Sequence, residues 1–469
     1  MAPRFLLNRL LCPSPLMFWS YTLPFIYWAY LILTSSPIIA FDSVGYINLA
    51  HILYNPFEWD QYFRSGPTRE PLYSLVISLS MHIGTWLSIS YIYILKTLSL
   101  LLLALTMYLI HQLLKRINAA PWVQAGAVLY TGFSPVLINS ALCVYSEIVT
   151  FPLITAAVYF GWKFMDSLSE GPSGSSQPAW GLGLSLLGFT MTKGLGELLF
   201  PLFLCCLIIY GWQNVTGSFL SFIKRSRRKI LIVLLIFYIP LLGFKSMNYL
   251  MNHHFTLTNR ANINVYGNLV HRSQVPLNLT AVTSNLLTVP ISYDLCSKFY
   301  PDPVCYQWSM RASDQTFFDR EAQLNKLHLS EAEKNKILFR ELLQALTTKP
   351  LEQTLYFLQE GLKTFFWETS QGPFVVYPYW LERLFNNPWI VMLMSLGIGL
   401  LCFLAFLISF TLLKNRLVLI TLTLLVLLII LLSFVHILNR YAAVVAPLEI
   451  LLMFTCCDSL IRSIRKPRV

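Results

Sequence analysis

Long apolar runs alternate with short polar segments along most of the chain. A hydrocarbon core of about 30 Å requires about 20 apolar residues in a helix, and about ten runs approach that length. The run at 72–90 contains interleaved Ser, His and Thr residues, so an interfacial helix fits it better than a span. The pattern predicts membrane-spanning helices at residues 17–40, 91–113, 121–141, 145–164, 179–192, 196–213, 230–250, 388–412, 417–437 and 441–460.

Two longer polar stretches, 41–71 and 251–387, interrupt the apolar pattern. Ser330 and Glu333 are spaced as a capping box ahead of an amphipathic helix that carries Ile337, Leu338, Leu342 and Ala345 on one face. Pro350 can begin a further helix, through Leu355, Leu358 and Leu362 to Phe366, that lies against the membrane. A loop of this length is a small extramembrane layer and too long for a simple connector.

These elements predict an all-α polytopic membrane protein of about ten transmembrane helices with a helical layer outside the bilayer. Residues 1–250 form a first transmembrane module with its outer loop at 41–71. Residues 251–387 form the outer loop with amphipathic helices, and residues 388–469 form the C-terminal transmembrane helices.

Composition agrees with a membrane protein. The chain has 469 residues, of which 56% are hydrophobic and 12% charged, whereas soluble domains have about 25% charged residues. This excludes a soluble globular enzyme. The aromatic content of 14%, together with the apolar runs, excludes disordered, collagenous and coiled-coil proteins.

The net charge of +12 is a signal of membrane topology. With the N-terminus inside, the expected cytoplasmic segments hold sixteen basic and three acidic residues, whereas the 251–387 loop holds twelve of each. We therefore expect both termini in the cytoplasm, the two polar stretches outside, and Arg4 and Arg9 orienting a first helix that is not cleaved. No basic patch is interleaved with exposed aromatics, so nucleic acid is not an expected partner.

The cysteines do not suggest a metal site. Most of the nine, including the adjacent pairs at 205–206 and 456–457, lie in apolar runs and fit small buried residues. Only Cys296 and Cys305 lie in a polar stretch. They can form a disulfide if the outer compartment is oxidising, but the sequence does not decide whether they pair.

Ionisable residues at the outer ends of the predicted spans are the candidates for chemistry. An acid at such an end has an ordinary explanation as a helix cap or interface anchor, and Asp42 followed by Ser43 fits an N-cap. The predicted topology, however, brings six charged residues to one membrane face, with Tyr46 one helical turn after the first. They are Asp42, Arg69, Glu70, Glu147, Lys193 and Arg440.

The motifs that contain these residues resemble the GT-C superfamily of polytopic glycosyltransferases, most closely the branch of the aminoarabinose transferase and the dolichyl-phosphate-mannose-type enzymes. The similar elements are FDSVGYINLA after the first span, REPLYSLVIS at 69–78, SPVLINSALCVYSEIVTFPL at 134–153, FTLTNRANINVYGN at 255–268 and NRYAAVVAPLEILL at 439–452. The resemblance covers most of the chain as an architecture, through short motifs.

The resemblance implies a sugar donor on a polyprenyl phosphate, an acceptor that is a lipid, a glycan or a protein, and Asp42 as the catalytic base. An inverting transfer from a phosphate donor needs one carboxylate to accept a proton and cations to hold the leaving phosphate. Arg69, Lys193 and Arg440 are the candidate phosphate ligands, and Glu70, Glu147 and Tyr46 complete the expected substrate-binding set. The implied location is the bacterial inner membrane, with the active site on the periplasmic side.

Two positions leave alternatives open. Arg69, Glu70 and Pro71 stand where the aminoarabinose branch has a Lys and two prolines, which puts the identity of the donor in question. Glu147 can bind a metal, bind the acceptor or cap its helix. A divalent ion at Asp42 and Glu70 is conceivable, but no dense acidic cluster demands one, so the cofactor is left unknown.

Two other functions compete with a glycosyltransferase. A transporter or flippase of a lipid-linked or polar solute would show ionisable residues or broken helices near the middle of the bilayer, often with a pseudo-repeat. A catalytically silent scaffold would leave the outer charges without a purpose. The gathering of charges at one face and the absence of a repeat favour the transferase. Lys96 and Lys245, in apolar runs, are expected to snorkel to the interface.

Overall fold

The computed structural model describes residues 15–465 except 56–57, 67, 171–173, 214–217, 259–262, 276–277, 289–292, 330, 369–373, 386 and 435–438. The described part is almost entirely helical. Seven of its helices are long and apolar enough to cross a membrane, so the chain is a multi-pass all-α membrane protein. They are α2 (Pro15–Thr34), α6 (Tyr91–Arg116), α9 (Glu147–Ser169), α11 (Gly196–Gln213), α12 (Phe219–Asn252), α21 (Pro388–Ser409) with its 3-10 extension to Leu412, and the final helix from Ala443, most of which is α24 (Ala446–Arg465).

The other three predicted spans also correspond to helices. The run at 121–141 is broken into α7 (Pro121–Phe133) and α8 (Pro135–Leu142), which meet at an angle of 47°. Ser134 caps α8 by accepting a hydrogen bond from the Leu137 amide, and Pro135 begins the helix. The runs near 417 and 179 form α22 (Arg416–Leu432) and the 14-residue α10 (Gln177–Thr190). A total of ten membrane crossings remains a prediction.

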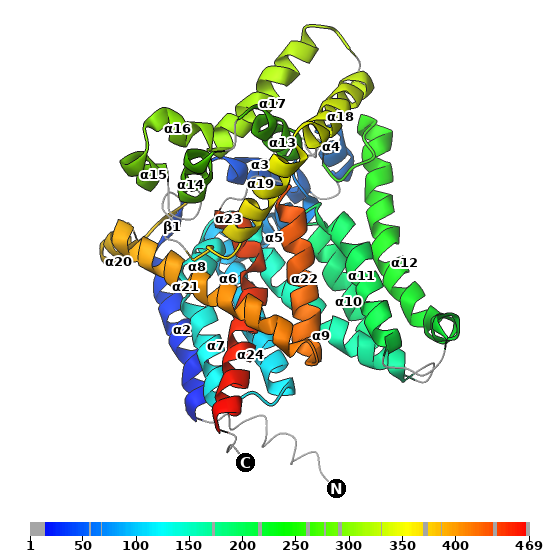
Figure 1. The fold of residues 1–469 in the computed structure, drawn as a ribbon, viewed down its shortest axis with the longest axis vertical. Coiled ribbons are helices and arrows are strands. Elements are labelled where there is room, and N and C mark those ends of the chain that lie inside the picture. The colour runs from blue at the N-terminus through cyan, green and yellow to red at the C-terminus, as the bar shows by residue number, and fades with distance from the viewer. Residues whose placement is uncertain are drawn as a thin grey trace.

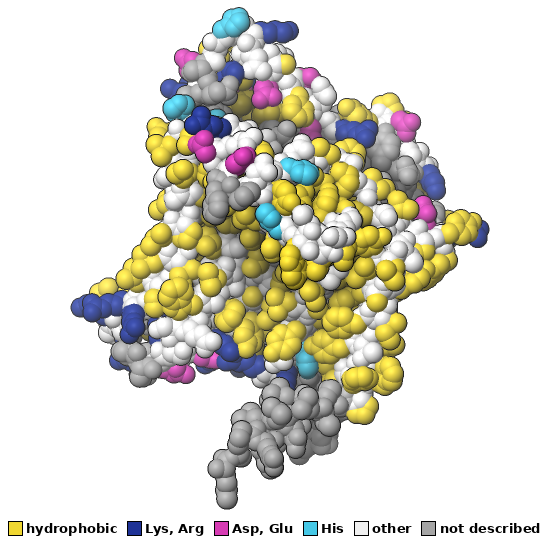
Figure 2. All heavy atoms as spheres, turned by 180° about the vertical axis from the view of Figure 1, so that it is seen from behind, with side chains coloured by type: hydrophobic (Ala, Val, Ile, Leu, Met, Phe, Trp, Pro, Cys, Tyr) yellow, Lys and Arg dark blue, Asp and Glu magenta, His cyan; other side chains and the backbone are white. Residues whose placement is uncertain are grey.

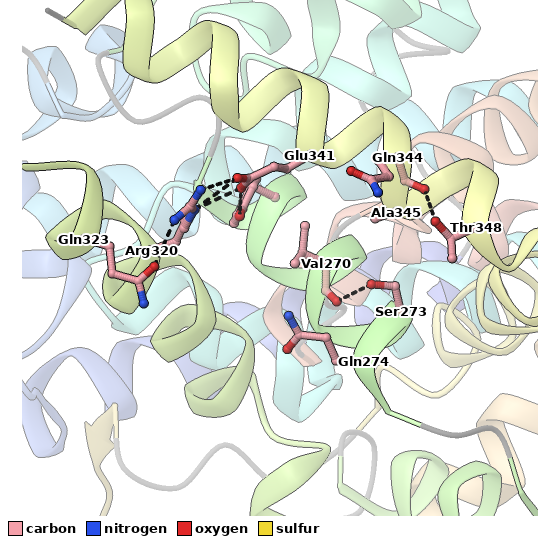
Figure 3. Close-up of a pocket in the computed structure, with 10 residues that line it drawn as sticks. Val270, Ser273, Gln274, Arg320, Gln323, Glu341, Gln344, Ala345 and Thr348 are labelled. Carbon is pink, nitrogen blue, oxygen red and sulfur yellow. Dashed lines mark hydrogen bonds and ion pairs between the residues drawn. The ribbon is translucent and has the colours of Figure 1, made fainter. Parts of the chain in front are cut away.

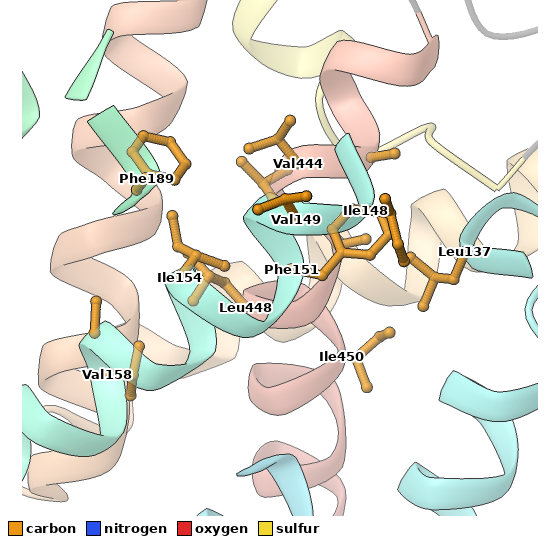
Figure 4. Packing of buried hydrophobic residues seen from close by; sticks show 14 of the residues in the cluster. Leu137, Ile148, Val149, Phe151, Ile154, Val158, Phe189, Val444, Leu448 and Ile450 are labelled. Atoms are coloured by element: carbon orange, nitrogen blue, oxygen red, sulfur yellow. The ribbon is translucent and has the colours of Figure 1, made fainter. Parts of the chain in front are cut away.

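The core of the bundle lies around α9. Buried residues make up 72% of its apolar window, the highest share among the seven long helices. Ile148, Phe151 and Ile154 on α9 pack with Val444 and Leu448 from the C-terminal helix, as Figure 4 shows. Because α9 begins at Glu147, the acid stands at the end of the most enclosed helix of the bundle.

A polar layer covers one end of the bundle (Figure 1). Its first part is α3 (Asp42–Tyr54) and α4 (Trp59–Arg64). They are followed by α5 (Pro71–Leu87), the run that the sequence predicts to be interfacial, which packs against α3 and α6. The second part is α13 (Ile263–Gln274), α14 (Leu279–Thr288), α15 (Tyr293–Phe299), α16 (Asp302–Gln307), α17 (Met310–Asn325), α18 (Glu331–Thr348) and α19 (Pro350–Lys363). We call these two parts, without α5, the polar layer.

The structure confirms most of the local predictions for the second part. Leu338 and Ala345 of α18 are buried, Leu338 against Tyr266 of α13 and Phe317 of α17, and Pro350 begins α19 as expected. The predicted cap Ser330 lies outside the described residues. Cys296 and Cys305 form a disulfide, with their Cα atoms 5.8 Å apart, whereas the cysteine pairs at 205–206 and 456–457 are free.

The chain returns to the bundle through a short antiparallel contact. Strand β1 (Ser36–Pro37) pairs with β2 (Val375–Val376), which places Ser36 opposite Val376. Helix α20 (Tyr379–Phe385) follows, and α23 (Asn439–Ala442) with a 3-10 turn (Ala443–Val445) leads into the last helix. The strand pair therefore joins the segment just before the first polar stretch to the last part of the second.

The expectation that Lys96 snorkels is wrong. Its ammonium group is buried and donates hydrogen bonds to the carbonyl oxygens of Ile32 and Ser35 at the C-terminal end of α2. Carbonyl groups at a helix end lack partners within the helix and carry partial negative charge, so a cation is stabilised there. Lys245 instead pairs with Glu197 at 2.7 Å.

Candidate functional site

Asp42 is the first residue of α3, and it does not serve as the N-cap. Phe41 occupies the N-cap position, with φ of 54°, and no side chain caps the helix there. Ser43 stabilises the turn instead, because its hydroxyl accepts a hydrogen bond from the Ala40 amide at 2.8 Å and donates one to the Ala40 carbonyl. The carboxylate of Asp42 is therefore available for interactions outside its own helix.

Asp42 forms an ion pair with Arg69, whose Nη2 donates to Oδ1 of the acid. Both side chains are about one quarter exposed, at 24% and 22%. Arg69 lies against α3 at Gly45, where an added Cβ would stand in ordinary van der Waals contact, 3.5 Å from the Arg69 Nε. This Nε is buried and has no hydrogen-bond partner. A buried donor without a partner is uncommon in folded proteins and needs an explanation.

Glu147 and Lys193 form a second pair, with 2.9 Å between Oε1 and Nζ. Glu147 is 2% exposed, and its other oxygen, Oε2, is buried without a hydrogen-bond partner. Burial by itself lowers the pKa of Lys193, but its acidic and phenolic neighbours, Glu147 first, hold that pKa above its ordinary value. Lys193 therefore stays a cation, and its ammonium group lies 5.4 Å from the ring centroid of Tyr441.

Glu70 and Tyr46 connect the two pairs. Oε1 of Glu70 accepts a hydrogen bond of 3.0 Å from the Gly194 amide, next to Lys193. The Tyr46 hydroxyl donates to Ser146 Oγ at 3.0 Å, next to Glu147, while the Arg69 guanidinium lies 5.9 Å from the Tyr46 ring. The structure thus brings six predicted residues together in what we call the charged cluster: Asp42, Tyr46, Arg69, Glu70, Glu147 and Lys193.

Arg440 is the remaining predicted residue. The backbone of α23 carries it, next to Tyr441, but its side chain lies outside the described part of the structure. Its contribution to the charged cluster stays a prediction.

Asp314, on α17, is a residue that the sequence did not single out. Burial first, and then the negative charge of Asp42, raise the pKa of its carboxyl group from 3.8 to about 6. The polar layer thus supplies a second carboxyl group close enough to Asp42 to interact with it electrostatically. Nothing in the sequence distinguishes Asp314 from Asp319 or Glu321 on the same helix, because its position depends on how α17 packs in the polar layer, chiefly against α13.

A metal site is not evident from the ligand set. Among the described residues, no group of three or more His, Cys, Asp or Glu side chains converges in a way that could hold an ion. The expectation of a divalent cation therefore stays open.

A separate set of buried polar side chains joins α13, α14 and α19. We call it the buried network, and its members are Arg272, Asn285, Glu360 and Lys363. Oε1 of Glu360 lies 2.8 Å from Lys363 Nζ and 3.3 Å from Arg272 Nη2, and Asn285 Oδ1 accepts a hydrogen bond from Lys363 at 2.5 Å. All four side chains are at most 2% exposed. Burial lowers the pKa of Lys363 to about 8 even though Glu360 raises it.

A polar groove lies between α13, α17 and α18 (Figure 3). Its volume is about 400 Å³, within the usual range of small-molecule pockets. Arg320 pairs with Glu341, which also accepts a hydrogen bond from the Tyr266 hydroxyl at 2.6 Å, so the charges of the groove compensate each other. Sequence analysis did not identify this groove.

No protein-family model matches the chain, and no curated protein matches it either. The similarity to GT-C enzymes therefore depends on the short motifs that carry the charged cluster.

Proposed function

We propose that this protein is an integral-membrane glycosyltransferase that moves a sugar from a polyprenyl-phosphate donor to an acceptor, with Asp42 as the general base. One observation carries the proposal. In the charged cluster, the carboxylate of Asp42 stands beside the unpartnered Nε of Arg69, and the unpartnered Oε2 of Glu147 belongs to the same cluster. A donor and an acceptor left without partners in one cluster of charges are suited to a ligand that is both anionic and hydroxylated.

The proposed chemistry divides these roles between the two ion pairs. Asp42 takes the proton from the acceptor hydroxyl as its oxygen bonds to the sugar, and the bond between the sugar and the phosphate breaks. Arg69 and Lys193 hold the negative charge that develops on the leaving phosphate, which needs no acid partner. Arg440 is the third proposed phosphate ligand. Attack opposite the leaving group inverts the configuration of the sugar.

Asp314 supports the assignment of the base. Two carboxyl groups that repel each other retain a proton at higher pH than either does alone. A carboxylate that must accept a proton near neutral pH benefits from such a neighbour. We therefore propose that Asp314 assists proton uptake at Asp42.

We propose a bacterial inner-membrane location with ten spans, cytoplasmic termini and the polar layer on the periplasmic side. The Cys296 and Cys305 disulfide supports this orientation, because disulfides persist in oxidising compartments. Single cysteines test it. An impermeant maleimide should label Lys326→Cys in intact cells, whereas Ser221→Cys should react only after the membrane is opened. The reverse result would invert the topology.

Asp42→Asn tests the proposed activity. Purified protein is given radiolabelled polyprenyl-phosphate sugars together with a membrane extract as the source of acceptors, and labelled product is measured. We expect the variant to lose about 10²- to 10⁴-fold in rate, the usual contribution of a general base. The matched control is Asp60→Asn, an acid of the same polar stretch that is exposed and pairs only with Arg64. Equal product from wild type and Asp42→Asn would remove Asp42 as the base.

A transporter or flippase is the alternative, and one observation favours it. Glu449, inside the last long helix, is 1% exposed and accepts a hydrogen bond from Trp367 Nε1 at 2.6 Å. Nearby, Glu368 accepts hydrogen bonds from Tyr130 and Ser134. Buried carboxyl groups among membrane helices often serve transport. Movement of intact labelled lipid across proteoliposomes, without transfer of the sugar, would favour this alternative.

A further inference from the structure

The first turns of α12 form a strongly basic surface at the end of the molecule opposite the polar layer. Lys224, Arg225, Arg227 and Arg228 are all exposed, and we call these four residues the basic surface. Figure 2 shows a group of Lys and Arg side chains at the tip of this helix, on the left of the view.

Helix geometry places the four cations on one face. At about 100° per residue, they occupy one continuous arc, whereas Phe222, Ser226 and Lys229 fall on the opposite side. Those three residues are buried, and the Lys229 ammonium donates to the Ser167 carbonyl of α9. One cation of the segment therefore attaches α12 to the bundle, and the other four point away from it.

The basic surface differs from other cations at this end of the bundle. Arg116 and Arg416 both pair with Asp166, each at 2.5 Å, and Arg462 pairs with Asp458 at 2.7 Å. Within the described ranges, none of the four cations of the basic surface has an acidic side chain at ion-pair distance. Four neighbouring positive charges repel each other unless an external anion compensates them.

The position of these residues along α12 identifies the source of that anion. The helix has 34 residues and is about 51 Å long, so it exceeds a hydrocarbon core of about 30 Å by several turns. Its apolar part begins directly after Lys229, and Leu231, Leu235 and Ile239 are exposed there, as lipid-facing residues are. The basic surface consequently reaches the level of the lipid headgroups, and exposed Leu220 can enter the interface beside it.

We infer that the basic surface of α12 binds the phosphate headgroups of anionic membrane lipids. Clustered Lys and Arg residues immediately beside a transmembrane helix attract anionic lipids, and the attraction is screened by salt. This inference does not depend on the proposed function, because it concerns the opposite end of the molecule.

The test is lipid selectivity measured by electron spin resonance on the full-length protein in phosphatidylcholine vesicles. Spin-labelled phosphatidylglycerol and spin-labelled phosphatidylcholine are compared by the fraction of each that the protein immobilises. We expect phosphatidylglycerol to associate about threefold or more strongly in about 0.1 M salt, and the preference to fall towards unity in about 1 M salt.

Two matched quadruple variants localise the effect. Replacing Lys224, Arg225, Arg227 and Arg228 by Gln should abolish the preference. Replacing Arg311, Lys326, Lys336 and Arg340 by Gln removes the same charge from exposed positions of the polar layer and should leave it intact. Equal association of the two lipids with wild type, a preference that salt does not weaken, or a preference retained by the α12 variant would each overturn the inference. Because the salt titration uses wild type, a misfolded variant would not leave the question open.

Discussion

The charged cluster and the buried network use the same kinds of residue but differ in solvent access. In the charged cluster, the side chains of Asp42, Arg69 and Lys193 are about one fifth to one quarter exposed. In the buried network, one carboxylate oxygen of Glu360 holds both cations, and no side chain is more than 2% exposed. Solvent can exchange for a ligand at the first, whereas the second is closed.

The difference shows that burial of charge does not by itself indicate a functional site. Buried ion pairs are often neutral for stability relative to apolar packing, but breaking one by removing a single partner is costly. On α19 the buried network faces inward while Leu351, Leu355, Leu358 and Leu362 are exposed on the other side. This arrangement suits a helix whose outer face meets lipid, as the sequence predicted. The buried network therefore holds α19 on the protein, and the charged cluster is the one for which we propose chemistry.

The strongest test of this contrast is Glu360→Gln. The substitution leaves Arg272 and Lys363 buried without a counter-charge, so we expect the free energy of unfolding to fall by about 3–5 kcal/mol. The transfer activity of the fraction that remains folded should be unchanged. Glu352→Gln, on the same helix in a partly exposed pair with Lys349, is the control and should cost less than about 1 kcal/mol. Similar losses for the two variants, measured by denaturant unfolding in detergent, would remove the distinction between the clusters.

Removing the disulfide between Cys296 and Cys305 tests how much the polar layer contributes to the stability of the buried network. The disulfide joins α15 to α16, and both pack on α14, which carries Asn285. Replacing Cys296 and Cys305 by Ala should reduce stability by about 2–3 kcal/mol, as expected for closing a short loop. The free pair Cys205 and Cys206 provides the control, because replacing both by Ala removes no crosslink. Reductant should lower the thermal midpoint of this control and of wild type, and should leave the Cys296 and Cys305 variant unchanged. An identical response of all three would contradict the pairing.

The smallest expected effect is a pH-dependent change in stability on replacing Asp314, which lies beside the charged cluster. Because the pKa of Asp314 is raised to about 6 in the folded protein, ionisation above that pH costs stability. The cost declines as the pH falls through 6 and disappears below 3.8, where both the folded and the unfolded state are protonated. Asp314→Asn should therefore be more stable than wild type at pH 7.5, by about 1 kcal/mol after allowance for partial exposure, and equal to it near pH 4. Asp319→Asn, on the same helix but exposed, should show no such crossover in thermal unfolding. A stability difference for Asp314→Asn that is independent of pH would show that the pKa of Asp314 is not raised in the folded protein.

The sequence predicted the positions of helix ends better than it predicted which charged side chains pair. The apolar runs placed Asp42, Glu147 and Lys193 at helix termini on one side of the bundle, and the structure has them there. The ion pairs themselves join residues 27 and 46 positions apart, and no local pattern encodes such a distance. The misjudged Lys96 has the same origin, since its partners are carbonyl groups of another helix. Asp314 and the buried network were missed because only the packing of α13, α14, α17 and α19 brings these side chains to their partners.

What the sequence determined by itself is a bundle of membrane helices with charges at their ends. In a bilayer, backbone polar groups must be satisfied within each segment, so a long apolar run has no alternative to a helix. The tertiary structure decided which charges meet, which of them water can reach, and which polar atoms lack partners. Those properties depend on side chains from distant segments converging in space, and the free energy of a charge depends on its surroundings far more than on its neighbours along the chain.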